Sequence, residues 1–412
     1  MKNASIKIAL FLNYFVFAIL LNSVGTVILQ VQRNFDISKA DASILEGFKD
    51  LPIAITSFLI ASFLPKIGLK KSMLISLAFV AIICAVMPFS DAFWYFKMLF
   101  LVIGVSFAMI KVSVFATIGI ITNNQKEHGS FMNILEAIFM AGVLIGNIFI
   151  SQFINDGNPK SKEWLVVYWI LSAMSVVAFV LLFFAKLDES RAKVESRSLA
   201  NDFAEMFVLV VKPLSIVFII SIFFYVMLEQ SFSTWFPTFY KEILHTPSSM
   251  AIQAGAILAG ATFIGRLLSG FVLLRVKWIY FLSICLAIIG IIVLVVLPMA
   301  KETKIDLTQT TTWFNAPLVV YLLPIMGLFL APIYPTVNST ILSSLPKHMH
   351  SSMSGLIVVF SALGGTTGSI ITGHIFEAFD GTTAFYFSLV PVVVIFISLW
   401  ILYKITDKNA SN

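Results

Sequence analysis

Six ionisable residues stand inside long apolar stretches of the sequence, where an ionised group is costly to bury. They are Glu46, Lys49, Asp50, Lys111, Glu136 and Glu229, and Arg266 stands nearer the end of another such stretch. In a hydrocarbon environment each such group costs about 2.5 to 3.5 kcal/mol. We therefore expect each of them to have a partner, to face water, or to take part in moving an ion or a solute.

Lys111 stands in the centre of the apolar run SFAMIKVSVF, residues 106–115. If these stretches are helices, Lys111 lies about eleven residues, roughly 16 Å, from the end of its own helix. Glu136 lies about eight residues, roughly 12 Å, into the next helix from the same side. A direct ion pair would partly offset the cost of burying both groups. Such a pair either ties two helices together or faces a cavity where a solute or a proton competes for one member.

Glu46, Lys49 and Asp50 occur within the segment ILEGFKDLPIAI. Positions i, i+3 and i+4 share one face of a helix, so the three side chains are expected to be neighbours. Two carboxylates that flank one ammonium form a mixed environment suited to a titratable site. The alternative is a salt bridge that satisfies itself in a wet vestibule near one end of the helix.

Glu229 stands near the middle of another apolar stretch, beside Gln230, and has no basic neighbour in the sequence. A carboxyl group at that depth can carry a proton, which makes Glu229 the first candidate for proton coupling. The alternative is a carboxyl that is hydrogen-bonded within a helix bundle. Arg266 presents a planar fork of donors that suits a carboxylate or a phosphate, although it can also serve only to tie helix ends together.

These residues form two candidate sets. The proton-coupling set is Glu229, Glu136, Glu46 and Asp50, and the substrate-binding set is Lys111, Asn22, Trp235, Asn338 and Arg266. The two amides and the indole are included because polar and aromatic side chains suit the lining of a polar cavity. If Lys111 and Arg266 both face that cavity, the site suits an anionic or zwitterionic solute.

The stretches that must position these side chains are long enough to cross a membrane. The chain has 412 residues, of which 59% are hydrophobic and 12% are charged, and its mean hydropathy is +0.97. A helix of about 20 apolar residues crosses a bilayer. We expect about twelve such spans, at residues 5–32, 39–65, 70–91, 93–122, 128–154, 164–186, 212–241, 247–275, 278–299, 315–343, 348–378 and 381–404. The sequence therefore predicts an all-α, multi-pass membrane protein.

Basic residues are distributed unevenly between the two sets of connections. One set has sixteen, namely Lys2, Lys7, Lys66, Lys70, Lys71, Lys126, Lys186, Arg191, Lys193, Arg197, Lys212, Arg275, Lys277, Lys347, Lys404 and Lys408. The other has seven, namely Arg33, Lys39, Lys160, Lys162, Lys241, Lys301 and Lys304. Because basic loops stay on the cytoplasmic side, we expect both termini in the cytoplasm, in a bacterial inner (plasma) membrane. The uneven distribution of basic residues, rather than the net charge of +6, orients the chain in its lipid bilayer. The positive charge therefore implies no nucleic-acid partner.

The one long polar stretch in the interior, residues 187–205, separates six spans from six. It predicts an N-terminal bundle at residues 1–190, a cytoplasmic linker at 191–211 and a C-terminal bundle at 212–412. The fifth span carries Gly142 and Gly146, and the eleventh carries Gly364 and Gly368, each as GxxxG followed by a polar exit. Small residues at this spacing let helices pack closely, and such internal repetition is typical of transporters.

Six spans plus six, a central linker, and the short basic turns SFLPKIGLKKS and GFVLLRVKWIY at matching places resemble the major facilitator superfamily. The resemblance implies two pseudo-symmetric six-helix bundles and transport by alternating access. The superfamily's signature turn is partly kept, with Gly68, Lys70 and Lys71 present and Pro65 where an acidic residue would stand. Pro332 and Pro335 predict a bend in the tenth span.

Four segments are similar to the fucose permease type of sugar:proton symporter, namely VILQVQRNF, MLEQSFSTWFPTFY, GATFIGRLLSGFVLLRVK and GLFLAPIYPTVNS. Symporters of this type use one acidic residue in the first span and one in the fourth for proton coupling. Here the first span has no Asp or Glu, and the fourth has Lys111. The sugar specificity and the proton pathway that the resemblance implies therefore do not carry over residue by residue to this chain.

The predicted function is secondary active transport of a small polar solute, such as a sugar, a sugar acid or another organic anion or zwitterion, with protons as the second partner. A proton-driven efflux antiporter of amphipathic compounds has the same architecture and is the alternative. An enzyme is not expected, because only His374 among five histidines falls well inside a span and it has no acidic or metal-ligating partner at i+4. No GxxxxGK[ST] loop is present to bind ATP. We expect no cofactor, no metal, no disulfide between Cys84 and Cys285, and a functional monomer.

Overall fold

The computed structural model describes residues 4–122, 125–189, 208–303, 312–345 and 349–411. Nearly all of these residues are helical, and no strand occurs among them. Apolar segments in a membrane become helices because the hydrocarbon offers no partner for a backbone N–H or C=O, and a helix satisfies both internally. The predicted linker at 191–211 lies outside the described residues except for its last four positions.

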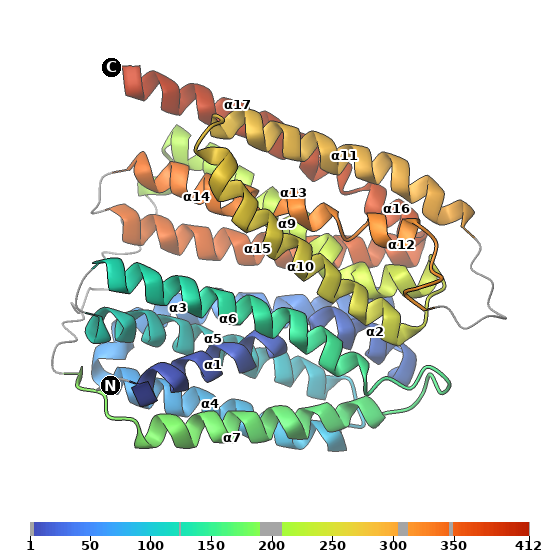
Figure 1. Cartoon of the computed structure of the whole chain (residues 1–412), viewed down its shortest axis with the longest axis horizontal. Helices are drawn as coiled ribbons and strands as arrows, with labels where there is room; N and C mark the ends of the chain where they lie inside the picture. The colour runs from blue at the N-terminus through green and yellow to red at the C-terminus, as the bar shows by residue number, and fades with distance from the viewer. Residues whose placement is uncertain (1–3, 123–124, 190–207, 304–311, 346–348, 412) are drawn as a thin grey trace.

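The N-terminal half contains seven of the helices (Figure 1). They are α1 (Ala4–Asn22), α2 (Val24–Phe35), α3 (Lys39–Ile67), α4 (Leu69–Val86), α5 (Trp94–Ile121), α6 (Gln125–Ser151) and α7 (Val167–Phe184). The C-terminal half contains α9 (Pro213–Glu242), α10 (Ser248–Leu273), α11 (Trp278–Glu302), α12 (Val319–Leu322), α13 (Met326–Leu330), α14 (Ile333–Ser343), α15 (His350–Ala378), α16 (Gly381–Tyr386) and α17 (Leu389–Ser411).

These helices make twelve spans. Within the described ranges, eleven helical segments are long and apolar enough to cross a bilayer, and α3, with 29 residues, is the additional one. The pair α1 and α2 forms one span, as do α12 to α14 and the pair α16 and α17. The predicted twelve-helix, all-α membrane fold is confirmed.

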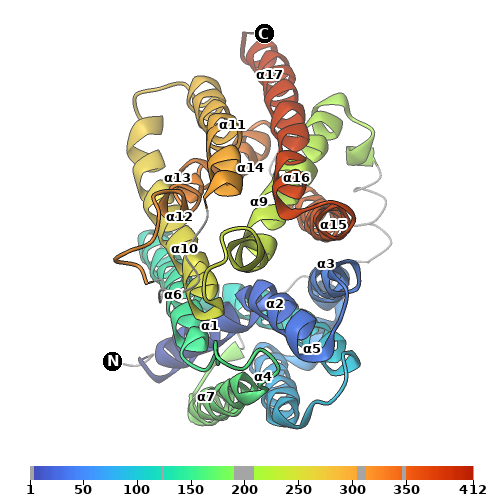
Figure 2. The same ribbon diagram turned by 90° about the vertical axis from the view of Figure 1, so that its right-hand side faces the viewer.

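The two halves lie one above the other, and both termini lie at the same end of the helices (Figure 1). We call this the termini end, and we call the opposite end, where Lys39 and Glu242 lie, the far end. The halves meet where α3 packs against α15, α6 against α10, and α2 against α9 (Figure 2). The second span thus packs on the eleventh and the fifth on the eighth, while the first packs on the seventh.

The two GxxxG motifs bring helices together within each half, as the sequence predicts. A Cβ atom on Gly142 of α6 would lie 2.9 Å from the carbonyl oxygen of Phe15 in α1. A Cβ atom on Gly368 of α15 would lie 2.5 Å from the carbonyl oxygen of Met227 in α9. Because only glycine allows such close approach, the first span packs on the fifth and the seventh on the eleventh in the same way.

The tenth span is broken into three pieces. Helix α12 ends before Pro324, α13 ends at Leu330, and α14 begins at Ile333, directly after Pro332. Proline lacks a backbone N–H and therefore interrupts the hydrogen-bond ladder of a helix. The span is therefore interrupted between α13 and α14, next to Pro332, where the sequence predicts a bend.

The basic turn before α4 is held by a carboxylate from beyond α7. The Glu189 carboxylate accepts hydrogen bonds from the backbone N–H groups of Leu69 and Lys70, each at 2.9 Å. Lys70 Nζ in turn donates to the carbonyl oxygens of Phe183 and Ala185, each at 2.8 Å. An anion at a helix N-terminus is favourable, so Glu189 stabilises this turn although Pro65 replaces the acidic residue of the signature.

Candidate functional site

The far end is closed by bonds that cross from one half to the other. Lys39 Nζ lies 3.1 Å from the carboxylate of Glu242, and the backbone N–H of Ala40 donates to Glu377 at 2.7 Å. Arg33 donates to the hydroxyl of Ser248.

Asp156 adds a second closing contact at this end. Its carboxylate accepts hydrogen bonds from the backbone N–H of Ser248 at 2.5 Å and from the Ser249 hydroxyl at 2.5 Å. These groups form the N-terminus of α10, whose dipole favours a negative charge. The connection between α6 and α7 therefore caps a helix of the other half.

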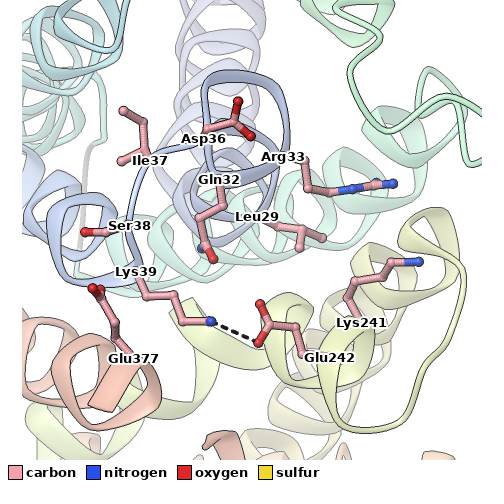
Figure 3. Close-up of a pocket in the computed structure, with 10 residues that line it drawn as sticks. All are labelled: Leu29, Gln32, Arg33, Asp36, Ile37, Ser38, Lys39, Lys241, Glu242 and Glu377. Atoms are coloured by element: carbon pink, nitrogen blue, oxygen red, sulfur yellow. Dashed lines mark ion pairs between the residues drawn. The ribbon is translucent and has the colours of Figure 1, made fainter. Parts of the chain in front are cut away.

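A cavity of about 530 Å³ lies among these bonds (Figure 3). It is lined by residues of both halves, namely Leu29, Gln32, Arg33, Asp36, Ile37, Ser38, Lys39, Lys241, Glu242 and Glu377. The lining contains three cationic and three anionic side chains, and the Lys39–Glu242 ion pair crosses it. This cavity belongs to the closed far end.

Glu46, Lys49 and Asp50 form a buried cluster at the interface of the two halves. The Glu46 carboxylate pairs with Lys49, and Lys49 Nζ lies 3.5 Å from Asp50. Their exposed fractions are 0%, 6% and 9% in chain order. The mutual contacts expected from the i, i+3, i+4 spacing are therefore present.

The Glu46 carboxylate also bonds the cluster to the C-terminal half. Glu46 accepts hydrogen bonds from Gln230 Nε2 at 3.1 Å and from the Thr234 hydroxyl at 2.9 Å, both on α9. The cluster is therefore a buried connection between the two halves, about two helical turns along α3 from Lys39.

Lys111 of α5 lies among aromatic rings. Its ammonium is 5.9 Å from the ring centre of Phe107 and 6.0 Å from that of Phe115, distances suited to cation–π attraction. Glu136 of α6 acts electrostatically on Lys111 and on Tyr14, but among the described residues it forms no ion pair with Lys111. The direct pair considered from the sequence is thus absent in the described part of the chain.

Glu229 of α9 has two cations in its surroundings, although none is near in sequence. Arg266 of α10 and Lys49 of α3 both act on it electrostatically. The Tyr225 hydroxyl lies 3.0 Å from its carboxylate. Arg266 also reaches across the interface, with its guanidinium 3.7 Å from the sulfur of Met140 on α6.

Lys111, Glu136, Glu229 and Arg266 are more accessible than the buried cluster on α3. Lys111 and Glu229 lie deep in the protein, yet Lys111 is exposed and Glu229 only half-buried. Glu136 and Arg266 are exposed as well. The hydrogen bonds and ion pairs that join described residues of the two halves lie at the depth of Arg266 or closer to the far end.

The three uncharged candidates lie in different surroundings. Asn22, at the end of α1, is exposed and donates to the carbonyl oxygen of Ala18 at 2.9 Å. The Asn338 amide oxygen on α14 is buried and has no hydrogen-bond partner in the described part of the chain. Trp235 is 0% exposed, and its indole donates to the carbonyl oxygen of Ser369 at 3.0 Å. In this structure Trp235 packs within the C-terminal half, away from the accessible groups.

Sequence reasoning missed the aromatic side chains around Lys111 and the partner of Glu229. Tyr14 packs against Phe115 and Phe139, with ring centres 6.4 Å and 5.9 Å apart. Forty phenylalanines offered no way to choose among them. Tyr225 stands four residues before Glu229 in a helix, and that spacing alone could have indicated the contact.

Comparison with known proteins gives one family match across most of the chain. A family model for the Major Facilitator Superfamily matches residues 9–369. A curated relative, bypass of stop codon protein 6 of Saccharomyces cerevisiae, is 23% identical over 269 residues, which are 59% of this chain and 52% of that protein. The match therefore spans about half the length of that relative.

Solved structures with the same fold cover nearly the whole chain. The nucleoside transporter NupG has a TM-score of 0.71 at 14% identity, over 97% of this chain and 99% of that one. The xylose transporter XylE from E. coli, in an inward open conformation, has a TM-score of 0.70 at 12% identity, over 97% and 95%. The transporter FucP, in the outward conformation, has a TM-score of 0.62 at 15% identity, over 96% and 98%. At these identities the likeness concerns the fold.

Proposed function

The chain belongs to the Major Facilitator Superfamily and is a transporter rather than an enzyme, and from this premise we propose that it takes up a small polar solute together with protons. The solute is a sugar acid or another organic anion or zwitterion. The observation that carries this proposal is the arrangement of four charged side chains, two from each half. One cation comes from each half, Lys111 and Arg266, and each has a carboxylate within electrostatic reach, Glu136 and Glu229.

Two cations that are not bound to their carboxylates suit a negatively charged group of a solute. A guanidinium fork binds a carboxylate with two parallel hydrogen bonds, and an ammonium at low dielectric adds a strong attraction. The exposed Asn22 amide and the unpartnered Asn338 oxygen supply donors and acceptors for hydroxyl groups. Trp235 would act by supporting the site from behind, since it is fully buried.

Proton coupling is assigned first to Glu229. It is half-buried, its carboxyl group is near the solute-binding Arg266, and a bound anion would compete with it for that cation. Glu136 is the corresponding carboxylate of the N-terminal half. Glu46 and Asp50 couple the proton to closure of the far end, because Glu46 also binds α9. A D-xylose–proton symporter and a fucose:proton symporter share the fold, which supports this assignment.

Transport then proceeds by alternating access between residues 1–190 and residues 212–412, joined by the linker at 191–211. The excess of basic residues at the termini end supports a cytoplasmic location for that end. The arrangement described above is then inward-facing, with the far end closed toward the outside. Uptake ends in this state, where the solute is released, and the broken tenth span provides a place where the C-terminal half can bend. The protein is expected to act as a monomer in a bacterial plasma membrane.

The test is transport into proteoliposomes with an imposed pH gradient, using labelled glucuronate, gluconate, glucose and a zwitterionic dipeptide. We expect accumulation of an acidic or zwitterionic solute only when the gradient is present. Glu229→Gln should still exchange that solute across the membrane but should not concentrate it. Full accumulation by this variant would overturn the role of Glu229. Export of amphipathic dyes driven by the same gradient, without accumulation of any polar solute, would instead support the efflux antiporter.

A further inference from the structure

The hydroxyl of Tyr225 lies between two acceptors that belong to different spans. Its oxygen is 3.0 Å from Oε1 of Glu229, one turn further along α9. It is also 3.1 Å from the carbonyl oxygen of Leu330, the last residue of α13. A tyrosine hydroxyl has one proton to donate. The carboxyl group and the carbonyl group therefore compete for it.

The proton state of Glu229 decides this competition. An ionised carboxylate only accepts hydrogen bonds, and a charge-assisted bond to it is about twice as strong as a bond between neutral groups. The hydroxyl then donates to Glu229 and not to Leu330. A protonated carboxyl donates its own proton to the Tyr225 oxygen, which frees the hydroxyl proton for Leu330. Loading one proton from water onto Glu229 thus adds one hydrogen bond between α9 and α13.

That additional bond acts directly at the bend of the tenth span. Leu330 is followed by Ala331 and Pro332, where the helix is interrupted, and α14 begins at Ile333. The ring of Tyr334, on the other side of the bend, packs against the Tyr225 ring with centres 5.8 Å apart. Tyr225 is 1% exposed, so water does not take the place of Glu229 or Leu330 as the acceptor of its hydroxyl proton. A change in its hydrogen bond is transmitted to the bend.

The charged groups around Glu229 link this change to the solute. Arg266 from α10 and Lys49 from α3 act on Glu229, and Tyr334 from α14 acts on Tyr225. Both cations favour the ionised carboxylate. An anion that binds Arg266 weakens this effect and makes proton uptake by Glu229 easier. Binding of solute, loading of the proton and bonding at the bend therefore favour one another.

We propose that Tyr225 is a positioning residue that transmits the proton state of Glu229 to the bend between α13 and α14. This inference rests on the proposed function in that Glu229 is the coupling carboxyl. The link itself needs no solute, so it can be tested without one. Glu229→Gln serves as a mimic of the protonated state, because its neutral amide can donate to the Tyr225 oxygen.

The test compares amide hydrogen exchange of peptides covering residues 323–340 in purified protein in lipid nanodiscs, at one pH near neutrality. We expect exchange about two- to tenfold slower in Glu229→Gln than in the wild type, the effect of one hydrogen bond. In proteins that also carry Tyr225→Phe, the amide exchange rate of these peptides should be the same with Glu or Gln at position 229. Equal exchange in wild type and Glu229→Gln, or a difference that survives Tyr225→Phe, would overturn the proposal.

Tyr240→Phe is the matched control. Tyr240 stands on the same helix, is 0% exposed, and donates to the carbonyl oxygen of Val320 at 2.5 Å, also in the tenth span. It touches no carboxylate among the described residues. Its loss should therefore leave the effect of Glu229→Gln unchanged. Peptides from α4 and α11 should exchange equally in all variants, which verifies folding.

Transport separates this proposal from the proposed function. If Glu229→Gln slows amide hydrogen exchange at the bend but still concentrates solute, the link through Tyr225 stands and the coupling role of Glu229 fails. If Glu229→Gln abolishes accumulation of solute without changing amide hydrogen exchange at the bend, the coupling role of Glu229 stands and the link through Tyr225 fails. A structural role for Tyr225 would not shift the pH profile of transport. The link predicts that Tyr225→Phe moves the profile to higher pH by about one to two units, since the ionised carboxylate loses its donor.

Discussion

The Lys39 ammonium lies 3.1 Å from the Glu242 carboxylate, and this ion pair joins the first turn of α3 to the last turn of α9. It thus crosses between the halves at the end where they are closed. The two side chains are 23% and 38% exposed, so water weakens but does not remove their attraction. An exposed ion pair contributes at most about 1 kcal/mol. The pair therefore adjusts the balance between closed and open far ends rather than fixing it.

Reversal of the charge at Lys39 should open the far end. Lys39→Glu replaces an attraction by a repulsion, and a change of up to about 1 kcal/mol corresponds to a two- to fivefold rise in the open population. A single cysteine introduced at Ser43, which is 0% exposed between α3 and α15, should react correspondingly faster with a membrane-impermeant maleimide. The native Cys84 and Cys285 are buried and should contribute little.

Lys160→Glu is the control for this experiment. Lys160 forms a 3.0 Å ion pair with Asp36 at the same end of the molecule, but both belong to the N-terminal half. Its reversal should leave the reaction rate at the introduced cysteine unchanged. The double variant Lys39→Glu with Glu242→Lys should restore the wild-type rate. Equal acceleration by the two single reversals would contradict a specific role for the pair between halves.

Removal of the Lys111 ammonium should weaken binding of acidic solutes. A hydrogen bond to a charged group contributes about 1.5 to 3 kcal/mol, so Lys111→Ala should lower the affinity for an acidic solute such as glucuronate about 10- to 100-fold. Binding of uncharged glucose should change little. Equilibrium binding to purified protein measures both.

Lys97→Ala is the matched variant for Lys111. Lys97 stands on the same helix, and its ammonium lies 4.8 Å from the ring centre of Phe93, so the substitution also removes a cation–π contact. Its position near the far-end turn of α5 keeps it away from Glu136. We expect no loss of affinity for acidic solutes. If both variants lose affinity equally, the effect comes from the overall charge of the chain.

The fold was predictable because it follows from local properties of the chain. Apolar runs of sufficient length give spans, and the GxxxG spacing at Gly142 and Gly368 gives close helix pairs. The depth of Lys111 and Glu136 follows from the rise per residue. Whether they touch depends on how each helix is rotated about its axis, which tertiary packing decides. The family assignment is confirmed, and the tenth span is interrupted beside Pro332, where the sequence predicts a bend.

The contacts of the candidate site were predictable only within one helix. Glu46 and Lys49 pair because three residues of helix separate them, but the partners Gln230 and Thr234 stand more than 180 residues away in sequence. Glu229 lacks a basic neighbour in sequence yet has Arg266 nearby in space. Such partners depend on the docking of two halves, which no short pattern encodes.

Acid should destabilise the start of the last span through Asp380. Its side chain caps α16 by accepting from the backbone N–H of Thr383 at 2.6 Å. Partial burial acts to raise the pKa of this carboxyl, but the hydrogen bonds from Thr383 outweigh burial, and the pKa is below its usual value. The stability it contributes is therefore complete above the unfolded pKa of about 3.9 and is lost as the pH falls through the folded value.

Substitution separates the cap from its charge. Asp380→Ala should destabilise this helix start by about 1 kcal/mol at neutral pH, seen as faster amide exchange in residues 381–388. Asp380→Asn keeps an acceptor and should behave nearly as the wild type at neutral pH, but without the loss of protection in acid. An Asn variant with the same acid response as the wild type would contradict the assignment to this carboxyl.

The buried cluster on α3 should tolerate loss of a carboxylate far better than loss of its lysine. Glu46, Lys49 and Asp50 together carry one net negative charge when all are ionised. Glu46→Gln or Asp50→Asn leaves one carboxylate beside the Lys49 ammonium, and these two carry no net charge. Gln at position 46 can still accept hydrogen bonds from Gln230 and Thr234. Lys49→Met leaves two buried carboxylates without a cation, and removing one partner of a buried ion pair costs about 3 to 5 kcal/mol.

Thermal unfolding of purified protein in detergent tests this order. Lys49→Met should lower the unfolding temperature much more than Glu46→Gln or Asp50→Asn, and adding both carboxylate substitutions to Lys49→Met should recover most of the loss. The order follows from burial, since the three side chains are at most 9% exposed. In a wet vestibule, water would solvate the two carboxylates and the three single variants would unfold at similar temperatures. That result would show that the cluster meets water, and its bond to α9 would then contribute little to closing the far end.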